Sequence, residues 1–180
     1  MIYKLKDLAY NNKESSKEVF KMKDKIMILT ILIIIFFVCP ITASELENYY
    51  FQTSFYTHHY SQKEYKNNQQ QLLGIERHYT DNDLDGIAFF KNTYDQNTVY
   101  LYRGTNYYLF SVGKTEITAK FTYGIIHGYD DENGRYSTWM HDMGTFPGAV
   151  FSFGLRREPL RLDIVPFADA GIIITGGVEF

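Results

Sequence analysis

Apolar and polar residues alternate along most of the chain after residue 43. One face of residues 116–129 carries Ile117, Ala119, Phe121, Tyr123 and Ile125. Because successive side chains of a strand point to opposite faces, a period of two predicts β-strands. Eight such segments, rich in β-branched and aromatic residues, follow one another at residues 50–60, 72–79, 86–92, 98–110, 116–129, 148–157, 160–167 and 171–180.

Clusters of turn-forming residues separate these segments. The separators include residues 80–83 (Thr-Asp-Asn-Asp), 94–97 (Tyr-Asp-Gln-Asn), 113–114 (Gly-Lys), 130–134 (Asp-Asp-Glu-Asn-Gly) and 158–159 (Glu-Pro). No long helical pattern and no internal repeat interrupts the series. The predicted fold class is therefore all-β, with consecutive strands antiparallel.

A soluble sandwich and a membrane barrel would both alternate in this way, so strand length and aromatic placement must distinguish them. The strands run to about eight to ten residues, near the length that a tilted spanning strand requires. Aromatic residues gather toward strand ends, as in the girdles of outer-membrane barrels; they include Tyr49, Tyr50, Tyr100, Tyr102, Tyr107, Tyr108 and Tyr129. The second, fourth and sixth turns are short, whereas the link from Asp130 to Pro147 is long. We expect residues 44–180 to form a closed eight-stranded antiparallel up-and-down transmembrane β-barrel, with a soluble periplasmic β domain as the alternative.

Residues 1–43 differ sharply from the rest of the chain. Seven lysines precede or border an apolar run of 14 residues from Ile26 to Cys39, which is followed by Pro40 and the small residue Ala43. Basic, apolar and small-residue regions in this order predict a secretory signal peptide, and hence a bacterial outer-membrane location for the barrel. The run is shorter than the roughly 18 residues of a spanning helix, which argues against a membrane anchor. Met22 is an alternative start, in which case residues 1–21 are an extension.

Charge and cysteine content exclude several classes of function. Residues 1–43 hold seven of the 18 Lys and Arg and four of the 21 Asp and Glu, so the remainder carries a net charge near −6. A nucleic-acid-binding protein would carry a basic surface instead. Cys39 is the only cysteine and belongs to the predicted signal peptide, which leaves the barrel without a thiol nucleophile or disulfide. We expect no metal and no cofactor.

Alternation and strand direction also predict which residues face the lumen, and at what height. Three acids and three bases fall toward the periplasmic half, where they can neutralise one another: Glu76, Lys120, Arg156, Arg161, Asp163 and Glu179. Four apolar residues fall toward the outer half: Ile126, Val150, Val165 and Ile173. Eight strands enclose room only for side chains or one small ligand. The four residues therefore either line a well for a hydrocarbon chain or form an ordinary packed core.

Several segments carry a family resemblance by their order and spacing. They are residues 55–60 (Phe-Tyr-Thr-His-His-Tyr), 65–68 (Tyr-Lys-Asn-Asn), 90–94 (Phe-Lys-Asn-Thr-Tyr), 160–166 (Leu-Arg-Leu-Asp-Ile-Val-Pro) and the terminal Phe180. With these segments the chain resembles the lipid A palmitoyltransferase (PagP-like) family of small outer-membrane barrels. The resemblance implies a lateral opening for lipid near Pro166, and recognition of the aromatic C-terminus by the barrel-assembly machinery.

The resemblance also implies a site at the outer rim. A His, an Asp and a Ser of that family are implicated in moving a fatty-acyl chain from a phospholipid to lipid A, and by position these correspond to His58 or His59, Asn92 and Thr93. The neutral Asn92 departs from the family, because an amide can neither act as a base nor steady an imidazolium as a carboxylate does. The alternatives are a solvated histidine pair and ordinary turn chemistry at residues 92–97.

The sequence therefore supports two functions of different class. One is an acyltransferase of the lipid A palmitoyltransferase type, whose partners are membrane lipids, either phospholipid alone or phospholipid and lipid A. The other is a non-enzymatic structural or adhesive barrel that acts through its outer loops. A calcium loop at residues 81–92 is disfavoured, because position twelve is Asn92 rather than Glu and the flanks are strands. No ligand spacing supports a metal site at His127, His141 and Asp142.

Overall fold

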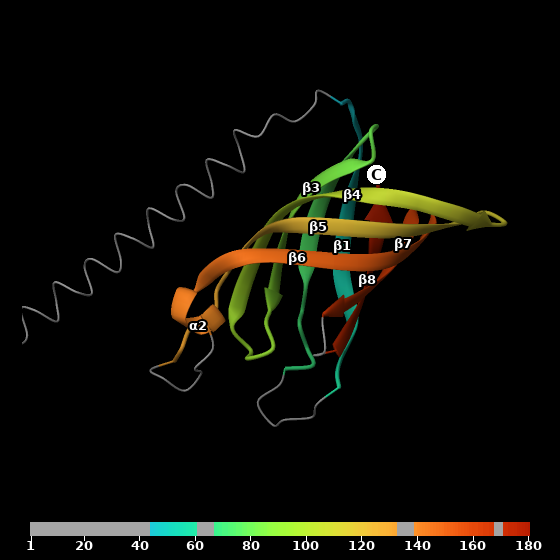
Figure 1. Ribbon diagram of the computed structural model, residues 1–180. Helices are drawn as coiled ribbons and strands as arrows, with labels where there is room; N and C mark the ends of the chain where they lie inside the picture. Colours follow the sequence, from blue (N-terminus) through green and yellow to red (C-terminus); the bar gives the residue numbers. More distant parts are fainter. Residues whose placement is uncertain (1–43, 61–66, 133–138, 168–170) are drawn as a thin grey trace, which may run out of the picture. The chain divides into compact units, whose positions relative to one another are not determined.

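The computed structural model describes residues 44–60, 67–132, 139–167 and 171–180. The predicted signal peptide and the segment 65–66 of the family resemblance lie outside these residues. Eight antiparallel strands form a closed barrel in which each strand pairs with its neighbours in sequence and the last pairs with the first (Figure 1). The predicted all-β, eight-stranded up-and-down barrel is thereby confirmed. The elements are β1 (Leu46–His59), β2 (Leu73–Tyr79), β3 (Asp83–Lys91), β4 (Asn97–Val112), β5 (Thr115–His127), α2 (Trp139–Met143), β6 (Thr145–Arg157), β7 (Leu160–Phe167) and β8 (Gly171–Glu179).

Some strands are longer than the alternation predicted. β6 begins at Thr145 rather than at Gly148, because residues 145–147 pair with residues 125–127 of β5. The predicted long link from Asp130 to Pro147 is therefore shorter, and α2 occupies part of it. Strand pairing continues as long as the partner offers a hydrogen-bonding edge, which local sequence cannot reveal.

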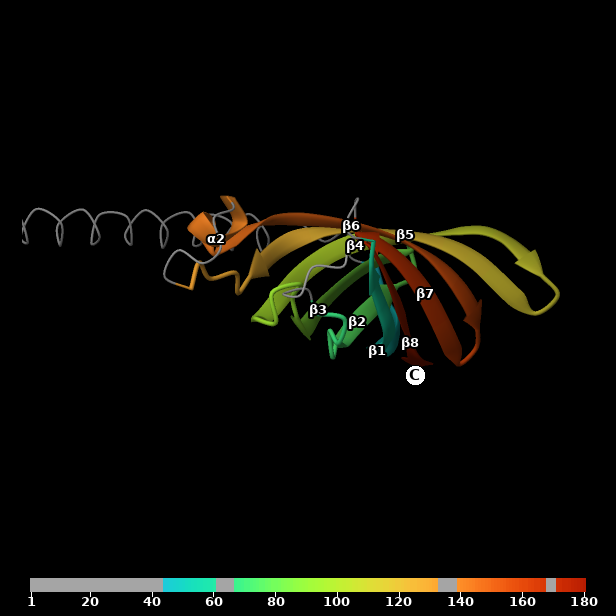
Figure 2. The same ribbon diagram turned by 90° about the horizontal axis from the view of Figure 1, so that it is seen from below.

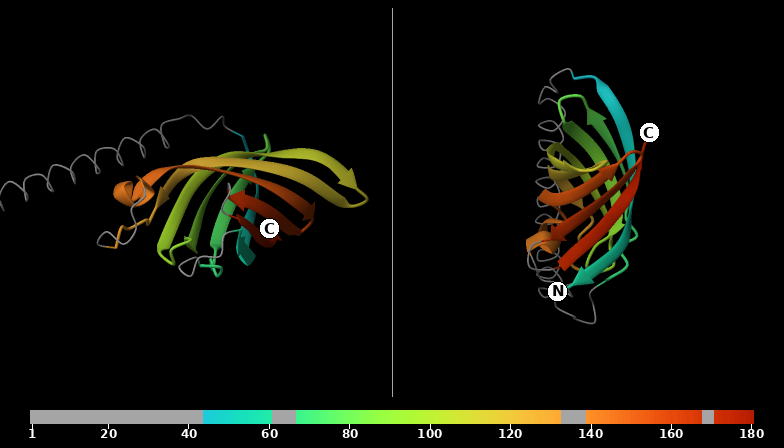
Figure 3. Two further views of the ribbon diagram at one scale, coloured as in Figure 1. Left: turned by 60° about the horizontal axis from the view of Figure 1, so that its bottom comes forward. Right: turned by 90° about the vertical axis from the view of Figure 1, so that its right-hand side faces the viewer.

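The two ends of the barrel differ. We call one end of the barrel the turn end; it carries the short connections after β2, β4 and β6, the start of β1 and the end of β8. The other, the loop end, carries the connections after β1, β3, β5 and β7. At the turn end, pairing of β3 with β4 stops at Asp83 and Thr105, but β4 continues to Val112. The resulting β4–β5 hairpin extends well beyond β3, as Figures 2 and 3 show in yellow-green.

An irregularity in β1 decides which residues face the lumen near the loop end. The pairing of β1 with β8 shifts between Ser54 and Tyr56, and both Phe55 and Tyr56 are exposed on the outside. A bulge adds one residue to a strand and so reverses the alternation beyond it. Gln52 is buried before the bulge, whereas Thr57 and His59 are buried after it.

The outside of the barrel is rich in large apolar side chains. Exposed examples occur on every strand and include Phe51, Phe55, Ile75, Phe89, Tyr107, Phe110, Phe121, Tyr123, Phe151, Phe153, Leu155, Leu160, Leu162, Ile164 and Val178. The inside is largely polar toward the turn end, with Glu76, Asp163 and Arg161 all buried. Within the described residues, no helix is long and apolar enough to cross a membrane.

Candidate functional site

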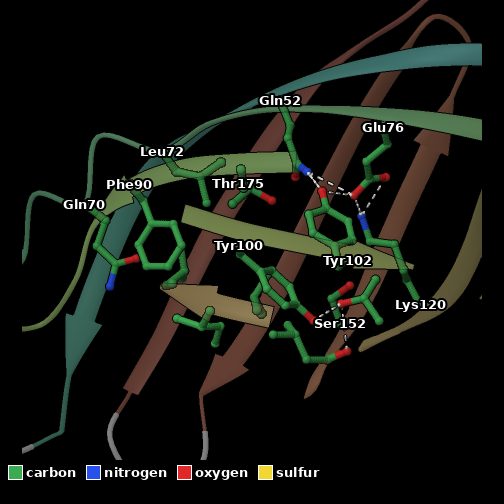
Figure 4. A pocket seen from close by; sticks show the side chains of 16 residues that line it. Gln52, Gln70, Leu72, Glu76, Phe90, Tyr100, Tyr102, Lys120, Ser152 and Thr175 are labelled. Atoms are coloured by element: carbon green, nitrogen blue, oxygen red, sulfur yellow. Dashed lines mark hydrogen bonds and ion pairs between the residues drawn. The ribbon is translucent and has the colours of Figure 1, made fainter. Parts of the chain in front are cut away.

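A cavity of about 120 Å³ lies inside the barrel between the loop end and the charged layer (Figure 4). The structure brings the four predicted well residues together in its wall, since Ile126, Val150, Val165 and Ile173 all line it. Leu72, Ala88 and Phe90 add further apolar surface. The upper part of the cavity is therefore a hydrocarbon-lined space, of the kind that suits an apolar ligand.

The floor of the cavity is a hydrogen-bonded group around Glu76, visible on the right of Figure 4. The Lys120 Nζ lies 2.8 Å from Glu76 Oε1, and the hydroxyl of Tyr102 and the amide of Gln52 each donate to the same oxygen at 3.0 Å. Glu76 Oε2 is 2.8 Å from the His78 Nε2. Because Glu76 and Lys120 are both buried, this group of partners is what makes two charges tolerable inside the barrel.

The remaining charges of the predicted set lie on the turn-end side of this floor. Asp163 Oδ2 lies 3.1 Å from the Arg161 Nε and 3.5 Å from the Lys120 Nζ. The Arg156 Nε lies 2.7 Å from Glu179 Oε2. Arg156 and Glu179, together with His78, line a second, polar cavity of about 240 Å³. The charged layer thus lies between the two cavities, and its acids and bases pair with one another as the sequence predicted.

A histidine with two polar neighbours lies above the apolar cavity. His59 is buried at 2% exposure; its Nδ1 lies 2.8 Å from Asn68 Oδ1, and its Nε2 lies 3.2 Å from Thr93 Oγ1. An amide oxygen only accepts, so Nδ1 carries the proton and the Nε2 lone pair accepts the Thr93 hydroxyl. Hydroxyl, imidazole and amide thus form a chain of the same type as a hydrolytic triad. We call these three residues the rim triad.

Three strand ends hold the rim triad in place. The bulge in β1 turns His59 inward, and the T-shaped contact of its ring with Phe167 of β7, 5.1 Å between centroids, fixes the ring plane. The segment that begins at Asn67 runs beside the end of β3, because the Asn67 backbone N–H donates to Thr93 O at 2.8 Å. This pairing places Asn68 and Thr93 on either side of the imidazole.

The other two residues of the predicted rim site have different surroundings. His58 points the opposite way from His59. Its ring stacks with that of Tyr56, with 6.3 Å between centroids, and makes a T-shaped contact with that of Tyr60 at 6.1 Å. Asn92 is buried, and its Oδ1 accepts the backbone N–H groups of Tyr94 and Gln96 at 2.8 and 3.1 Å. Asn92 thus stabilises the β3–β4 turn, which was the alternative considered for it. The structure brings His59 and Thr93 together, but not His58 or Asn92.

The rim triad stands directly over the mouth of the cavity. Thr57 pairs with the cavity residue Ile173, and two residues further along β1 the inward-facing His59 pairs with Gly171. Two residues of a strand span about 7 Å. On β3, two strands away, Phe90 lines the cavity, and Thr93 follows shortly after it. An ester held at the triad could therefore extend its acyl chain into the apolar space.

The barrel wall is incompletely paired beside this cavity. β6 and β7 pair only from Phe153–Ile164 to Arg157–Leu160, so β6 residues 145–152 have no partner on β7. Val150 and Val165 line the cavity on either side of this separation. Pro147 and Pro166 fall in the unpaired stretches, where a missing backbone N–H disrupts no ladder between these strands. The opening near Pro166 that the resemblance implied coincides with this separation.

The acidic and histidine residues considered for metal binding make hydrogen bonds and ion pairs within turns and between neighbouring strands. Asp81 Oδ1 accepts the Asp83 backbone N–H at 3.2 Å within the β2–β3 turn, and Asp85 forms a two-point ion pair with Arg77. His127 bonds to Thr145 at 2.7 Å across the β5–β6 pair. No group of three or more His, Cys, Asp and Glu side chains in the described part of the chain could hold a metal ion.

The chain matches no protein-family model, and no curated protein matches it. The family resemblance therefore remains a hypothesis, and function has to be inferred from the arrangement of side chains. Sequence comparison by position gave Asn92 as the partner of the histidine, whereas the geometry gives Asn68. The only sequence signal for Asn68 was its place in the asparagine-rich loop segment.

Proposed function

We propose that this protein is an outer-membrane barrel that binds a fatty-acyl chain of a membrane lipid and transfers it to a hydroxyl acceptor. The observation that carries the proposal is the rim triad of Asn68, His59 and Thr93 above an apolar cavity. A half-buried hydroxyl hydrogen-bonded to a buried, oriented imidazole is an arrangement suited to acyl transfer. The hydrocarbon-lined space below it suits the chain of a fatty-acyl ester.

Membrane insertion is supported by the outward-facing residues. Every strand exposes large aromatic or aliphatic side chains, such as Phe55, Phe153 and Leu160. Such a surface is costly in water, whereas an apolar band with aromatic girdles is the lipid-facing surface of outer-membrane barrels. The turn end, with the short connections, would face the periplasm, and the rim triad would lie at the outer leaflet. Export would depend on the signal peptide predicted in residues 1–43.

Lipid access is supported by the separation of β6 from β7. A phospholipid in the outer leaflet could pass its acyl chain between Val150 and Val165 into the cavity without leaving the membrane. Its ester would remain near the rim triad, because the charged floor around Glu76 excludes the headgroup from the other end. The wall separation and the position of the triad therefore predict the same orientation of the substrate.

The proposed transfer has two balanced steps. In the first, Thr93 Oγ attacks the ester carbonyl carbon while His59 Nε2 takes the hydroxyl proton; the bond to the glycerol oxygen breaks, and that oxygen receives the proton from His59. In the second, the acceptor hydroxyl attacks the acyl-Thr93 ester in the same way, and Thr93 regains its proton. The family resemblance makes lipid A the candidate acceptor.

Asn68 would act as the positioning residue of the triad. Its Oδ1 holds the His59 Nδ1–H and so selects the tautomer in which Nε2 is the base. Because an amide lacks the charge that stabilises an imidazolium, the substitution Asn68→Asp is expected to raise activity, whereas Asn68→Ala lowers it.

The test is mass spectrometry of phospholipids and lipid A from cells that produce the protein. We expect a new acylated lipid and the matching lysophospholipid with the wild-type chain, and their loss with His59→Gln and Thr93→Val, by about 100-fold or more. Thr93→Ser keeps the hydroxyl and is expected to retain activity. The matched control is His58→Gln, which changes a neighbouring imidazole that faces outward.

Two results would decide against transfer. If no lipid changes although the wild-type protein is folded in the outer membrane, the non-enzymatic barrel is the better conclusion. If His58→Gln abolishes the product and His59→Gln does not, the chemistry lies outside the rim triad.

A further inference from the structure

Gln70 places an unsatisfied polar group at the mouth of the apolar cavity. The residue is 5% exposed and its side chain lines the cavity near Leu72 and Phe90, on the left of Figure 4. Its buried Oε1 accepts no hydrogen bond from any residue in the described part of the protein. Buried amide oxygens are almost always hydrogen-bonded, so this atom points to a partner that binds from outside the chain.

The backbone places Gln70 one step below the rim triad. Asn67 N–H donates to Thr93 O, and Lys91 N–H donates to Gln70 O at 2.7 Å, so residues 67–70 run alongside the end of β3. Asn68 reaches the imidazole of His59, and Gln70, two residues on, lines the cavity. A chain whose ester lies at the triad would therefore pass Gln70 with its first few carbon atoms.

The chemistry of the free atom limits what the partner can be. A plain hydrocarbon chain leaves Gln70 Oε1 unsatisfied, and an ester carbonyl is itself only an acceptor. A hydroxyl donates a proton to the amide oxygen and is compatible with a hydrocarbon chain. We propose that the preferred acyl chain carries a hydroxyl close to its carboxyl end and that Gln70 selects it. This inference rests on the proposed function, because the triad fixes which end of the chain lies at the mouth.

Thr175 supplies a matched control within the same cavity. Its Oγ1 is also buried without a hydrogen-bond partner among the described residues. Thr175 lies two residues beyond Ile173 toward the turn end and pairs with Asp163, so it is deeper in the cavity than Gln70. A hydroxyl near the carboxyl end of the chain would bind at Gln70 and would not reach Thr175.

The experiment measures binding of two probes, tetradecanoic acid and 3-hydroxytetradecanoic acid, to the full chain folded in detergent. We expect the wild-type protein to bind the hydroxy acid about fivefold more tightly, as one additional neutral hydrogen bond provides. Gln70→Met, which keeps the length of the side chain, should bind both acids equally. Thr175→Val should retain the fivefold preference.

The outcomes separate this inference from the proposed function. Equal binding of the two acids by the wild-type chain, or a preference that survives Gln70→Met, would overturn the selection by Gln70 and leave an acyl site in which water satisfies the amide. Binding of neither acid would overturn both, because the cavity would then not be an acyl site.

Discussion

The buried ion pair between Lys120 and Glu76 offers the most direct test of the barrel's interior. We predict that Lys120→Met strongly destabilises the folded barrel. The substitution preserves much of the side-chain volume but removes the Nζ group that lies 2.8 Å from Glu76 Oε1 and 3.5 Å from Asp163 Oδ2. Both partners are almost fully buried, so the carboxylates cannot turn to solvent.

The size of the effect follows from the donors that remain. Removing one partner of a buried ion pair costs about 3–5 kcal/mol, because the other charge is left uncompensated. Glu76 keeps the partners Gln52, Tyr102 and His78, and Asp163 keeps Arg161. We therefore expect a loss near the lower limit, about 3 kcal/mol in the free energy of unfolding. The double variant with Glu76→Gln should recover at least half of it, since one of the two uncompensated charges is gone.

Equilibrium unfolding in urea, followed by the heat-dependent shift of the folded barrel in gel electrophoresis, measures these energies. The control is Lys91→Met, the same substitution in an exposed pair with Asp95 at 3.7 Å, which should cost below about 1 kcal/mol. Two results would contradict this reasoning: a cost of Lys120→Met no larger than that of the control, or a double variant no more stable than the single one. Either would mean that Lys120 does not stabilise the barrel by neutralising buried carboxylates.

Three further predictions concern the loop end, the wall and the cavity. Burial holds the pKa of His141 below its ordinary value of 6.5, so a fall in pH through 6.5 should protonate the unfolded loop in preference to the packed loop and so loosen the packed loop. The fluorescence emission of Trp139, the only tryptophan, should therefore shift between about pH 7.5 and 5. The same titration of His141→Gln should show no shift. A Cβ at Gly124 would overlap the carbonyl oxygen of Leu101, so Gly124→Ala should lower unfolding free energy by about 3 kcal/mol; an unchanged urea midpoint would contradict this. Ala88→Leu should fill part of the cavity and weaken tetradecanoic acid binding about tenfold, by displacing roughly two methylenes at about 0.8 kcal/mol each, and undiminished binding would place the acid elsewhere.

Residue alternation determined the class of fold and the composition of the lumen. The sequence alone predicted eight strands, the apolar group Ile126, Val150, Val165 and Ile173, and the opposed charges of Glu76 and Lys120. These predictions were possible because side chains of a strand alternate between its two faces with a period of two. In an up-and-down barrel each strand also crosses the barrel from one end to the other, so a residue's position along its strand gives its height in the barrel.

Only the tertiary structure decided the rim. Whether His58 or His59 faces inward depends on the bulge between Ser54 and Tyr56, which one extra residue in β1 creates and no local pattern announces. The partner of the imidazole is Asn68 rather than Asn92, because two loops distant in sequence meet there through a backbone hydrogen bond.

The separation of β6 from β7 was likewise beyond the alternation pattern. The pairing of the two strands ends at Phe153 and Ile164, although exposed and less exposed residues continue to alternate beyond that point. Outside the bulged end of β1, periodicity along the chain therefore fixed which side chains enter the lumen. Their neighbours around the barrel, and so the candidate chemistry at His59, were fixed by pairing between strands, a long-range property that depends on the whole closed sheet.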